Sequence, residues 1–174
     1  NAVHHACTNG NDKVLDKLLA FGSKSIGAHL EDETPEGSTA LHLAATHGHS
    51  RCVRILLRHG ANAAARDAKG QTALNIALEL ENETDEEEPF LDSRREGKAS
   101  LASPTSVAKR RLAKERATST VAALRDPSAL FWSHSVRANR LYSIEDFQGA
   151  RAAYDAAIEL TEKASPDTRI TSDA

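Results

Sequence analysis

The sequence contains no methionine, only two cysteines and few aromatic residues, and each shortage excludes a class of protein. Cys7 and Cys52 are too few for a disulfide framework, which favours a reducing compartment, the cytoplasm or the nucleus. An aromatic content of 4% disfavours a β-sandwich, which would need short alternating runs of Val, Tyr and Trp. No apolar run approaches the ~18 residues of a membrane span, so we expect no membrane association. Because the chain lacks an initiator methionine, we read Asn1 as a cut edge.

What the chain does contain favours closely packed helices. Alanine and leucine are abundant, and small side chains allow helices to approach one another. The formal net charge of −3 is that of a soluble protein and lacks the basic excess of a general nucleic-acid binder.

A repeat organises the first half of the chain. The middle copy reads Gly-Ser-Thr-Ala-Leu-His-Leu-Ala-Ala-Thr-His-Gly-His over 37–49, and a later copy reads Gly-Gln-Thr-Ala-Leu-Asn-Ile-Ala-Leu over 70–78. Thr39 and Thr72 lie 33 positions apart, and a looser copy begins with Val-His-His-Ala-Cys at 3–7. A fixed period of this length is typical of stacked helical repeats, in which one unit cannot bury its apolar face alone.

The local chemistry of one unit predicts two short helices. The Thr39 hydroxyl can cap the first helix, and Gly48 can end it with a positive φ. The second helix places Val53, Leu56 and Leu57 on one stripe at spacings of three and four. Residues 1–80 therefore predict two complete units and the first helix of a third.

This phrase resembles the ankyrin repeat, whose Thr-x-Leu-His, Gly-His and Leu-Leu-x-x-Gly-Ala motifs match 39–42, 48–49 and 56–61. The resemblance implies an L-shaped stack whose loop tips and short inner helices bind other proteins. Carried over position by position, it implies eight partner-facing residues: Pro35, Glu36, Ser38, Thr46, His47, Arg66, Lys69 and Gln71.

Two charged runs follow the repeats. Residues 79–92 hold eight acidic side chains and no basic one, whereas 94–116 hold eight basic side chains and two acidic ones. Like charges oppose compaction, so we expect a linker over 81–104. Helical spacing returns over 105–125, where Val107, Leu112, Val121 and Leu124 would lie on or near one face. We interpret this segment as a solvated cap on the stack; nucleic-acid binding is less favoured because the basic residues have no interleaved aromatics.

A second helical unit is expected over 126–163, followed by a tail over 164–174. Pro127 can stop one helix and Ser128 can begin the next, and two antiparallel helices would cross at Ala150 and Ala157. The segment resembles a single tetratricopeptide repeat through Asn139, Tyr142, Asp146, Phe147, Ala150, Tyr154, Ala157 and Leu160. An ordinary amphipathic helical hairpin is the alternative interpretation.

The tetratricopeptide resemblance implies a groove on the first helix of this pair. The residues that would line it are Trp132, Ser135, Asn139 and Tyr142. Chaperone-binding members of the family carry a lysine where this chain has Ser135, so we do not expect it to bind chaperone tails.

No cluster of residues predicts catalysis. His42, His47, His49 and Cys52 could suggest a zinc site, but the repeat accounts for each of them separately. No nucleophile–base pair and no phosphate-binding Gly-rich loop occurs, so we expect no cofactor, metal or small-molecule substrate.

The sequence therefore predicts an all-α protein, with an ankyrin-type solenoid followed by a tetratricopeptide-like hairpin. Its predicted function is that of a non-catalytic scaffold or adaptor for other proteins. The alternative is a targeting module of a larger enzyme, such as a ubiquitin ligase or a kinase, whose catalytic domain lies outside this segment.

Overall fold

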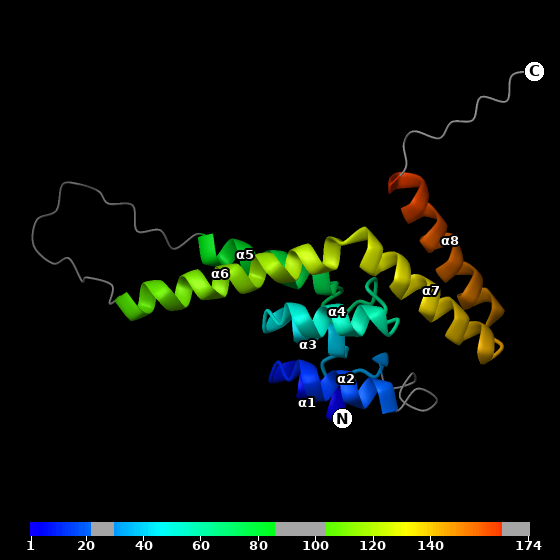
Figure 1. Ribbon diagram of the computed structural model, residues 1–174, viewed down its shortest axis with the longest axis horizontal. Coiled ribbons are helices and arrows are strands. Elements are labelled where there is room, and N and C mark those ends of the chain that lie inside the picture. The colour runs from blue at the N-terminus through cyan, green and yellow to red at the C-terminus, as the bar shows by residue number, and fades with distance from the viewer. Residues whose placement is uncertain (22–29, 86–103, 165–174) are drawn as a thin grey trace, which may run out of the picture.

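The computed structural model describes residues 1–21, 30–85 and 104–164, and every regular element within these ranges is a helix (Figure 1). The eight helices are α1 (Ala2–Thr8), α2 (Asp12–Phe21), α3 (Ala40–Thr46), α4 (Ser50–Arg58), α5 (Ala73–Asp85), α6 (Pro104–Arg125), α7 (Pro127–Ser143) and α8 (Phe147–Ala164). A single isolated bridge joins Arg66 to Thr72 in the same ranges. The all-α prediction is confirmed.

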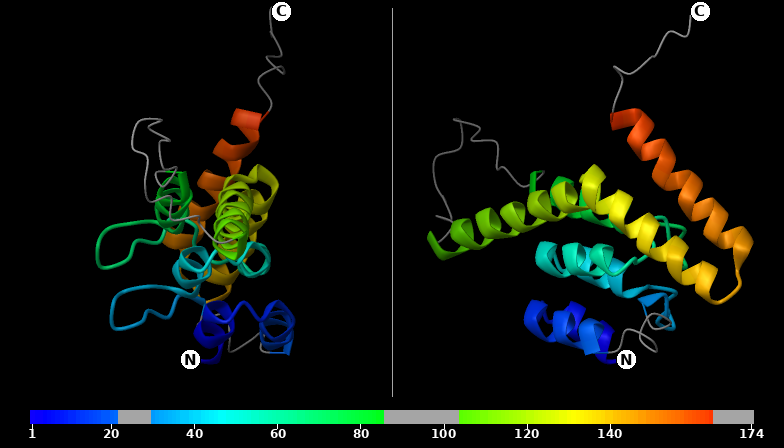
Figure 2. Two further views of the ribbon diagram at one scale, coloured as in Figure 1. Left: turned by 90° about the vertical axis from the view of Figure 1, so that its left-hand side faces the viewer. Right: turned by 45° about the vertical axis from the view of Figure 1, so that its right-hand side comes forward.

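The first six helices form two parallel rows. Helices α1, α3 and α5 contact one another in sequence and form the inner row, while α2, α4 and α6 form the outer row (Figure 1). Consecutive helices pair between the rows, so the pairs α1–α2, α3–α4 and α5–α6 are the three repeating units. Two loops project from the side of the inner row and lie one above the other (Figure 2).

The core lies between the rows and consists of leucines set among small residues. Leu15, Leu41, Leu56 and Leu57 are almost fully buried, as are the alanines of α3 and α5 that face them. Burial of one leucine stabilises the fold by about 1.5–3 kcal/mol, and the alanines allow the helix axes to approach. The apolar stripe predicted on the second helix of the middle unit is therefore its buried face.

Helix α5 is longer than the sequence predicted. A linker was expected to begin at residue 81, but α5 continues to Asp85, so this expectation is wrong for 81–85. The like-charged neighbours Glu79 and Glu83 destabilise a helix by only a few tenths of a kcal/mol. Helix α6 packs along α5, and this tertiary contact outweighs the repulsion. The remainder of the expected linker, 86–103, lies outside the described residues.

Helix α6 stands third in the outer row, where the second helix of the third unit belongs. Its C-terminal half buries Ala117, Val121 and Leu124 against α4 and α5. Leu112 was expected on the same face but is 49% exposed, because the N-terminal half of α6 has solvent around it over residues 108–116. The side chain of Val107 lies outside the described residues.

Helices α7 and α8 form an antiparallel hairpin that packs directly on the stack. Asp126 alone separates α6 from α7, and its carboxylate caps α7 by accepting from the Ser128 N–H at 3.0 Å. Pro127 occupies the first turn, where a missing N–H costs nothing. Ala138 and Ala157 are buried between the two helices, which permits their close approach.

Candidate protein-binding surfaces

The first loop tip, 33–38, contains a tight turn held by its own backbone. The Thr34 N–H donates to the Ser38 carbonyl at 2.9 Å, and the Gly37 N–H donates to the Thr34 carbonyl at 2.8 Å. Gly37 has a φ of +69°, which glycine adopts without strain. The Thr34 hydroxyl, which hydrogen-bonds to the Glu36 carboxylate, is the main cause of the lowered pKa of Glu36. This tip is rigid before any partner arrives.

The second tip, 66–71, is organised around one carboxylate. Asp67 accepts the backbone N–H groups of Lys69 and Gln71, both at 2.9 Å. These hydrogen bonds, led by that from Gln71, lower the pKa of Asp67, so the carboxylate remains charged well below neutral pH. The guanidinium of Arg66 donates to the Gly70 carbonyl at 2.7 Å, which closes the turn.

The two tips lie side by side and carry opposite charges. The Ala68 N–H of the second tip donates to the Glu36 carbonyl of the first at 3.4 Å (Figure 2). Repeat positions occupied by Glu33 and Glu36 in the first tip are occupied by Arg66 and Lys69 in the second. All four side chains are exposed, so the paired tips present an acidic strip beside a basic one.

His42 connects the inner helix to the second tip. It is buried, and its Nδ1 accepts the Thr39 N–H at 3.1 Å, so the proton is on Nε2. That nitrogen lies 3.2 Å from the Ala65 carbonyl and 3.1 Å from the Gln71 carbonyl, and it donates to both. Both ring nitrogens are therefore occupied within the fold.

The inner helices supply the floor beside the tips. Thr46 and His47 are exposed at the end of α3, as the sequence predicted for partner-facing residues. The 33-residue register places Glu79 of α5 in line with Thr46, and Gln71 Nε2 donates to Glu79 Oε1 at 2.6 Å. Leu43, one turn earlier on α3, is half-buried, which gives this floor an apolar strip.

Leu43 and Ile76 are members of this floor that the sequence prediction missed. Both are half-buried hydrophobic residues, and they occupy equivalent repeat positions on α3 and α5. The signal was present in the 33-residue register, because a residue one turn before Thr46 must share its face.

The turns between inner and outer helices form another edge of the stack. The rings of His47 and His49 lie 6.0 Å apart, and His49 Nε2 lies 3.3 Å from the Thr8 carbonyl of the preceding unit. Burial is the main cause of the lowered pKa of His49, so this ring is neutral at pH 7.

The predicted residues of the ankyrin-like part thus fall into two groups. Six lie on the tips and two at the end of α3. Ser38 and Gln71 are half-buried, and the others are exposed: Pro35, Glu36, Thr46, His47, Arg66 and Lys69.

The helical hairpin carries the other predicted residues on one flank of α7. Trp132, Asn139 and Tyr142 are exposed, whereas Ser135 is half-buried. The Tyr154 hydroxyl of α8 donates to Asn139 Oδ1 at 2.5 Å. The rings of Tyr142 and Phe147 meet edge to face with their centroids 5.4 Å apart. Residues of both helices therefore make up this flank.

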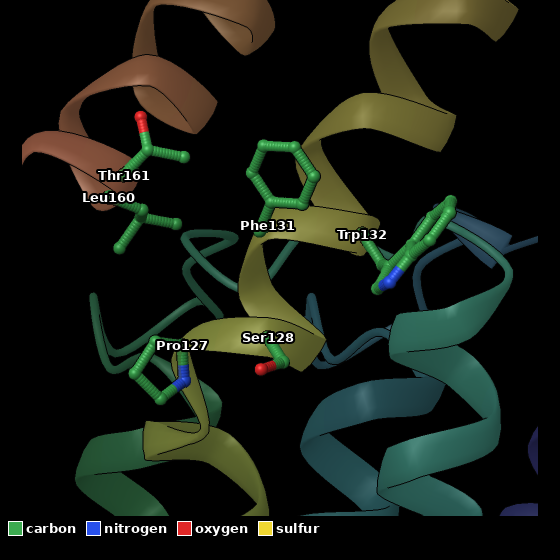
Figure 3. Close-up of a pocket in the computed structure, with 6 residues that line it drawn as sticks. All are labelled: Pro127, Ser128, Phe131, Trp132, Leu160 and Thr161. Carbon is green, nitrogen blue, oxygen red and sulfur yellow. The ribbon is translucent and has the colours of Figure 1, made fainter. Parts of the chain in front are cut away.

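A groove of about 250 Å³ lies between the start of α7 and the end of α8 (Figure 3). Pro127, Ser128, Phe131, Trp132, Leu160 and Thr161 line it. Phe131 points toward Leu160 and Thr161 of α8, whereas Trp132 points to the other side of α7. The lining is mostly apolar, with the hydroxyl residues Ser128 and Thr161 as its polar members, so the groove suits an apolar side chain and has no charged group to orient a polar substrate.

The docking of α7 rests on polar contacts that the sequence did not reveal. Ser133 Oγ donates to the Ala61 carbonyl at 2.6 Å, and the Arg140 guanidinium donates to the His59 carbonyl. Both acceptors follow the last turn of α4, where helical carbonyls have no partner of their own.

The described residues offer little for metal or thiol chemistry. No group of three or more His, Cys, Asp and Glu side chains in them could hold a metal ion. Cys7 and Cys52 are free and buried, and burial raises the pKa of Cys7 to about 12. The thiols are therefore protonated and poorly nucleophilic. No helix in the described ranges is both long enough and apolar enough to cross a membrane.

Residues 2–85 match the family model of ankyrin repeats, in three copies. This part of the chain is similar to ankyrin repeats. Its third copy is completed in the structure by α6, which lies beyond the matched stretch. The tetratricopeptide resemblance of α7 and α8 falls outside the match.

Three curated proteins illustrate the similarity. Potassium channel AKT2/3 of Arabidopsis thaliana is 40% identical over 71 residues, which cover 41% of this chain and 8% of that protein. SH3 and multiple ankyrin repeat domains protein 2 of Homo sapiens is 32% identical over 76 residues, which cover 44% of this chain and 4% of that protein. ADP-ribosylation factor GTPase-activating protein AGD4 of Arabidopsis thaliana is 36% identical over 85 residues, which cover 49% of this chain and 10% of that protein. The chain spans about a tenth or less of the length of these relatives.

Proposed function

We propose that this chain is a non-catalytic scaffold whose ankyrin tips and inner helices bind another protein. The observation that carries the proposal is the pair of exposed tips, which their own hydrogen bonds hold in place. Glu33, Glu36, Arg66 and Lys69 make no ion pair with one another within the described structure, so their charges face outward.

Such a surface binds efficiently because little of it has to be ordered. Immobilising a flexible side chain on binding costs about 0.5–1.5 kcal/mol, and an unstructured loop costs more. Here Asp67 and Thr34 already hold the backbone of the tips. The alternating charges of the tips would choose the partner and accelerate the encounter, while Leu43 and Ile76 would supply apolar contact.

The hairpin would provide a second protein-binding surface of tetratricopeptide type. Ala150 and Ala157 are buried where the resemblance implies that the two helices cross, and Ala138, which stands where that family usually has glycine, is buried as well. Trp132, Asn139 and Tyr142 share an exposed flank of α7, while the opposite flank rests on α4. Ser135 is half-buried and uncharged, so recognition here would be through aromatic and amide groups.

Proteins are the proposed partners in preference to nucleic acid or membrane. The exposed half of α6 carries Lys109, Arg110, Arg111, Lys114 and Arg116 but no aromatic residue for a base to stack on. We expect no retention on heparin even at low salt. Retention that declines steeply with added salt would favour nucleic acid instead. The buried free thiols fit the reducing environment of the cytoplasm or the nucleus.

The second candidate is a targeting module within a larger enzyme. The ADP-ribosylation factor GTPase-activating protein AGD4 contains a matching segment that is only 10% of its length, so such a segment can be a small part of a longer protein. The two proposals assign the same surfaces to these residues. They differ in whether a longer protein that contains this chain and its natural neighbouring segments has catalytic activity.

Capture of a partner by the immobilised chain tests the ankyrin surface. Lys69→Glu combined with Gln71→Ala should lose the protein captured by the unaltered chain. The control matched in charge is Lys17→Glu at an exposed position of the outer helix α2, which should retain it. If the tip variant captures the same protein as the control, the tips are not the binding surface. Asn139→Ala with Tyr142→Ala tests the hairpin surface in the same way.

A further inference from the structure

Aromatic residues are concentrated on the hairpin and exposed there. Five of the seven Phe, Tyr and Trp residues of the chain belong to α7 and α8, and none of the five is buried. On one face Tyr142 is 62% exposed, Phe147 59%, Tyr154 39% and Ile158 54%. We call these four residues the aromatic face. A large exposed apolar patch is informative, because single exposed hydrophobic residues are ordinary and clusters are not.

The aromatic face is contiguous across both helices. Phe147, Tyr154 and Ile158 recur at spacings of seven and four, which places them on one stripe of α8. The contact of Tyr142 with Phe147 joins that stripe to α7. Trp132 is also exposed, at 60%, but points to the other side of α7 and is not part of this face.

The area of this face is comparable with the core of a protein interface. An aromatic side chain buries about 150–250 Å², so the three rings of the aromatic face offer roughly 240–400 Å² at their observed exposure, and Ile158 adds to this area. A standard interface buries about 800 Å² on each partner, of which the apolar core is a part and the polar rim the remainder.

Charges beside the stripe favour a second copy of the same helix. Arg151 and Asp155, of opposite charge, lie one turn apart on this flank of α8. Within one chain, Arg151 and Asp155 are 3.8 Å apart on the exposed surface. In an antiparallel pair of such helices the like flanks face each other, so Arg151 of one copy can lie beside Asp155 of the other. The helix dipoles also oppose favourably in this arrangement.

We propose that the aromatic face binds a second copy of this chain, with the two α8 helices antiparallel around a two-fold axis. This inference rests on the protein-binding role proposed above for the hairpin, and names its partner. With the two-fold axis level with Ala153, midway between the two charged residues, Arg151 of each copy meets Asp155 of the other, and the aromatic residues pack between the copies. Such an interface is self-complementary, as two-fold symmetry requires. The tips project from the inner row, on a different side from the hairpin, and remain free (Figure 2).

Sedimentation and light scattering of the purified chain test this directly. The unaltered chain should form a dimer, and Ile158→Glu should make it monomeric. Leu112→Glu makes the same change at an exposed leucine of α6 and should leave the dimer intact. Circular dichroism should be the same for all three proteins, because both substituted side chains are largely exposed. A monomeric unaltered chain at up to about 100 µM would overturn the proposal.

Charge exchange tests the predicted orientation. Arg151→Glu alone and Asp155→Arg alone should each raise the dimer dissociation constant about tenfold, since two facing pairs become repulsive. An equimolar mixture of these variants should form a heterodimer of nearly normal affinity, because every facing pair is again of opposite charge. If mixing restores no association, the antiparallel arrangement is wrong.

Partner capture separates the two levels of the proposal. If the chain is monomeric but Asn139→Ala with Tyr142→Ala loses a captured protein, the second copy is refuted and the hairpin remains a binding surface. If the chain is monomeric and that variant still captures every protein that the unaltered chain captures, then neither the dimer nor the protein-binding role of the hairpin holds. The ankyrin surface is still tested by its own variants.

Discussion

Replacement of His42 by alanine should destabilise both the middle repeat and the tip that follows it. The substitution leaves the Thr39 N–H without an acceptor in a buried site, at a cost of about 1–3 kcal/mol. The carbonyls of Ala65 and Gln71 lose their donor but are half-buried, so water can satisfy them in part. Loss of the buried ring adds a cavity penalty. We expect a total loss of about 3 kcal/mol, a large share of the ~5–15 kcal/mol by which domains are stable.

Urea denaturation followed by circular dichroism measures this loss. The control is His47→Ala, because His47 is exposed and should change stability by no more than about 0.5 kcal/mol. A His42→Ala cost below about 1 kcal/mol would refute the structural role that we assign to both ring nitrogens. Since the ring also fixes the second tip, the variant should bind a tip-dependent partner more weakly even where it remains folded.

Three further outcomes follow from burial and backbone geometry. In urea denaturation, Gly60→Ala should destabilise the protein more than Gly70→Ala does. Both glycines have a positive φ, but a Cβ at Gly60 would lie only 3.0 Å from a backbone nitrogen of α7, whereas a Cβ at Gly70 would have no neighbour within 4 Å. Burial lowers the pKa values of His49, His59 and His134 below 6.5, so on acidification the unfolded chain takes up protons before the folded chain does. The free energy of unfolding should therefore fall as the pH drops below about 6.5, and His49→Gln should reduce this pH dependence. Cys7 and Cys52 should resist alkylation in native protein and react on unfolding, and equal rates in both states would contradict their burial.

The repeat and its local chemistry were accessible from the sequence because each unit carries its own signals. Thr39, His42 and Gly48 define a helix start, a tip support and a helix end at fixed spacing. The structure confirms the all-helical class and places Val53 and Leu56 in the core as the 3.6-residue period predicts. Exposure of the tips also follows from the resemblance, since loop residues that pack nothing remain at the surface.

Contacts between distant segments were not accessible in the same way. The periodicity of the sequence shows which face of α6 is apolar, but it does not show that α4 and α5 cover that face. From the sequence alone, α6 could therefore not be assigned to the third repeat. Extension of α5 through Glu81 likewise depends on α6 lying beside it. Ser133 and Arg140 looked like ordinary polar residues of a helix, because their acceptors lie more than seventy positions away in the sequence.

The position of α7 has a consequence for how the two proposed surfaces work together. Arg140 lies at the C-terminal end of α4, where the helix dipole stabilises a positive charge. Burial lowers the pKa of Arg140, and the charge of the nearby Glu31 opposes that effect. Because only Asp126 separates α7 from α6, the hairpin cannot swing away without breaking these contacts. A dimer through the aromatic face would therefore hold two ankyrin surfaces in a fixed relative orientation. A partner with two matching sites would then bind the second at an effective concentration far above its bulk value, and Ile158→Glu should abolish that gain while leaving the affinity of a single site unchanged.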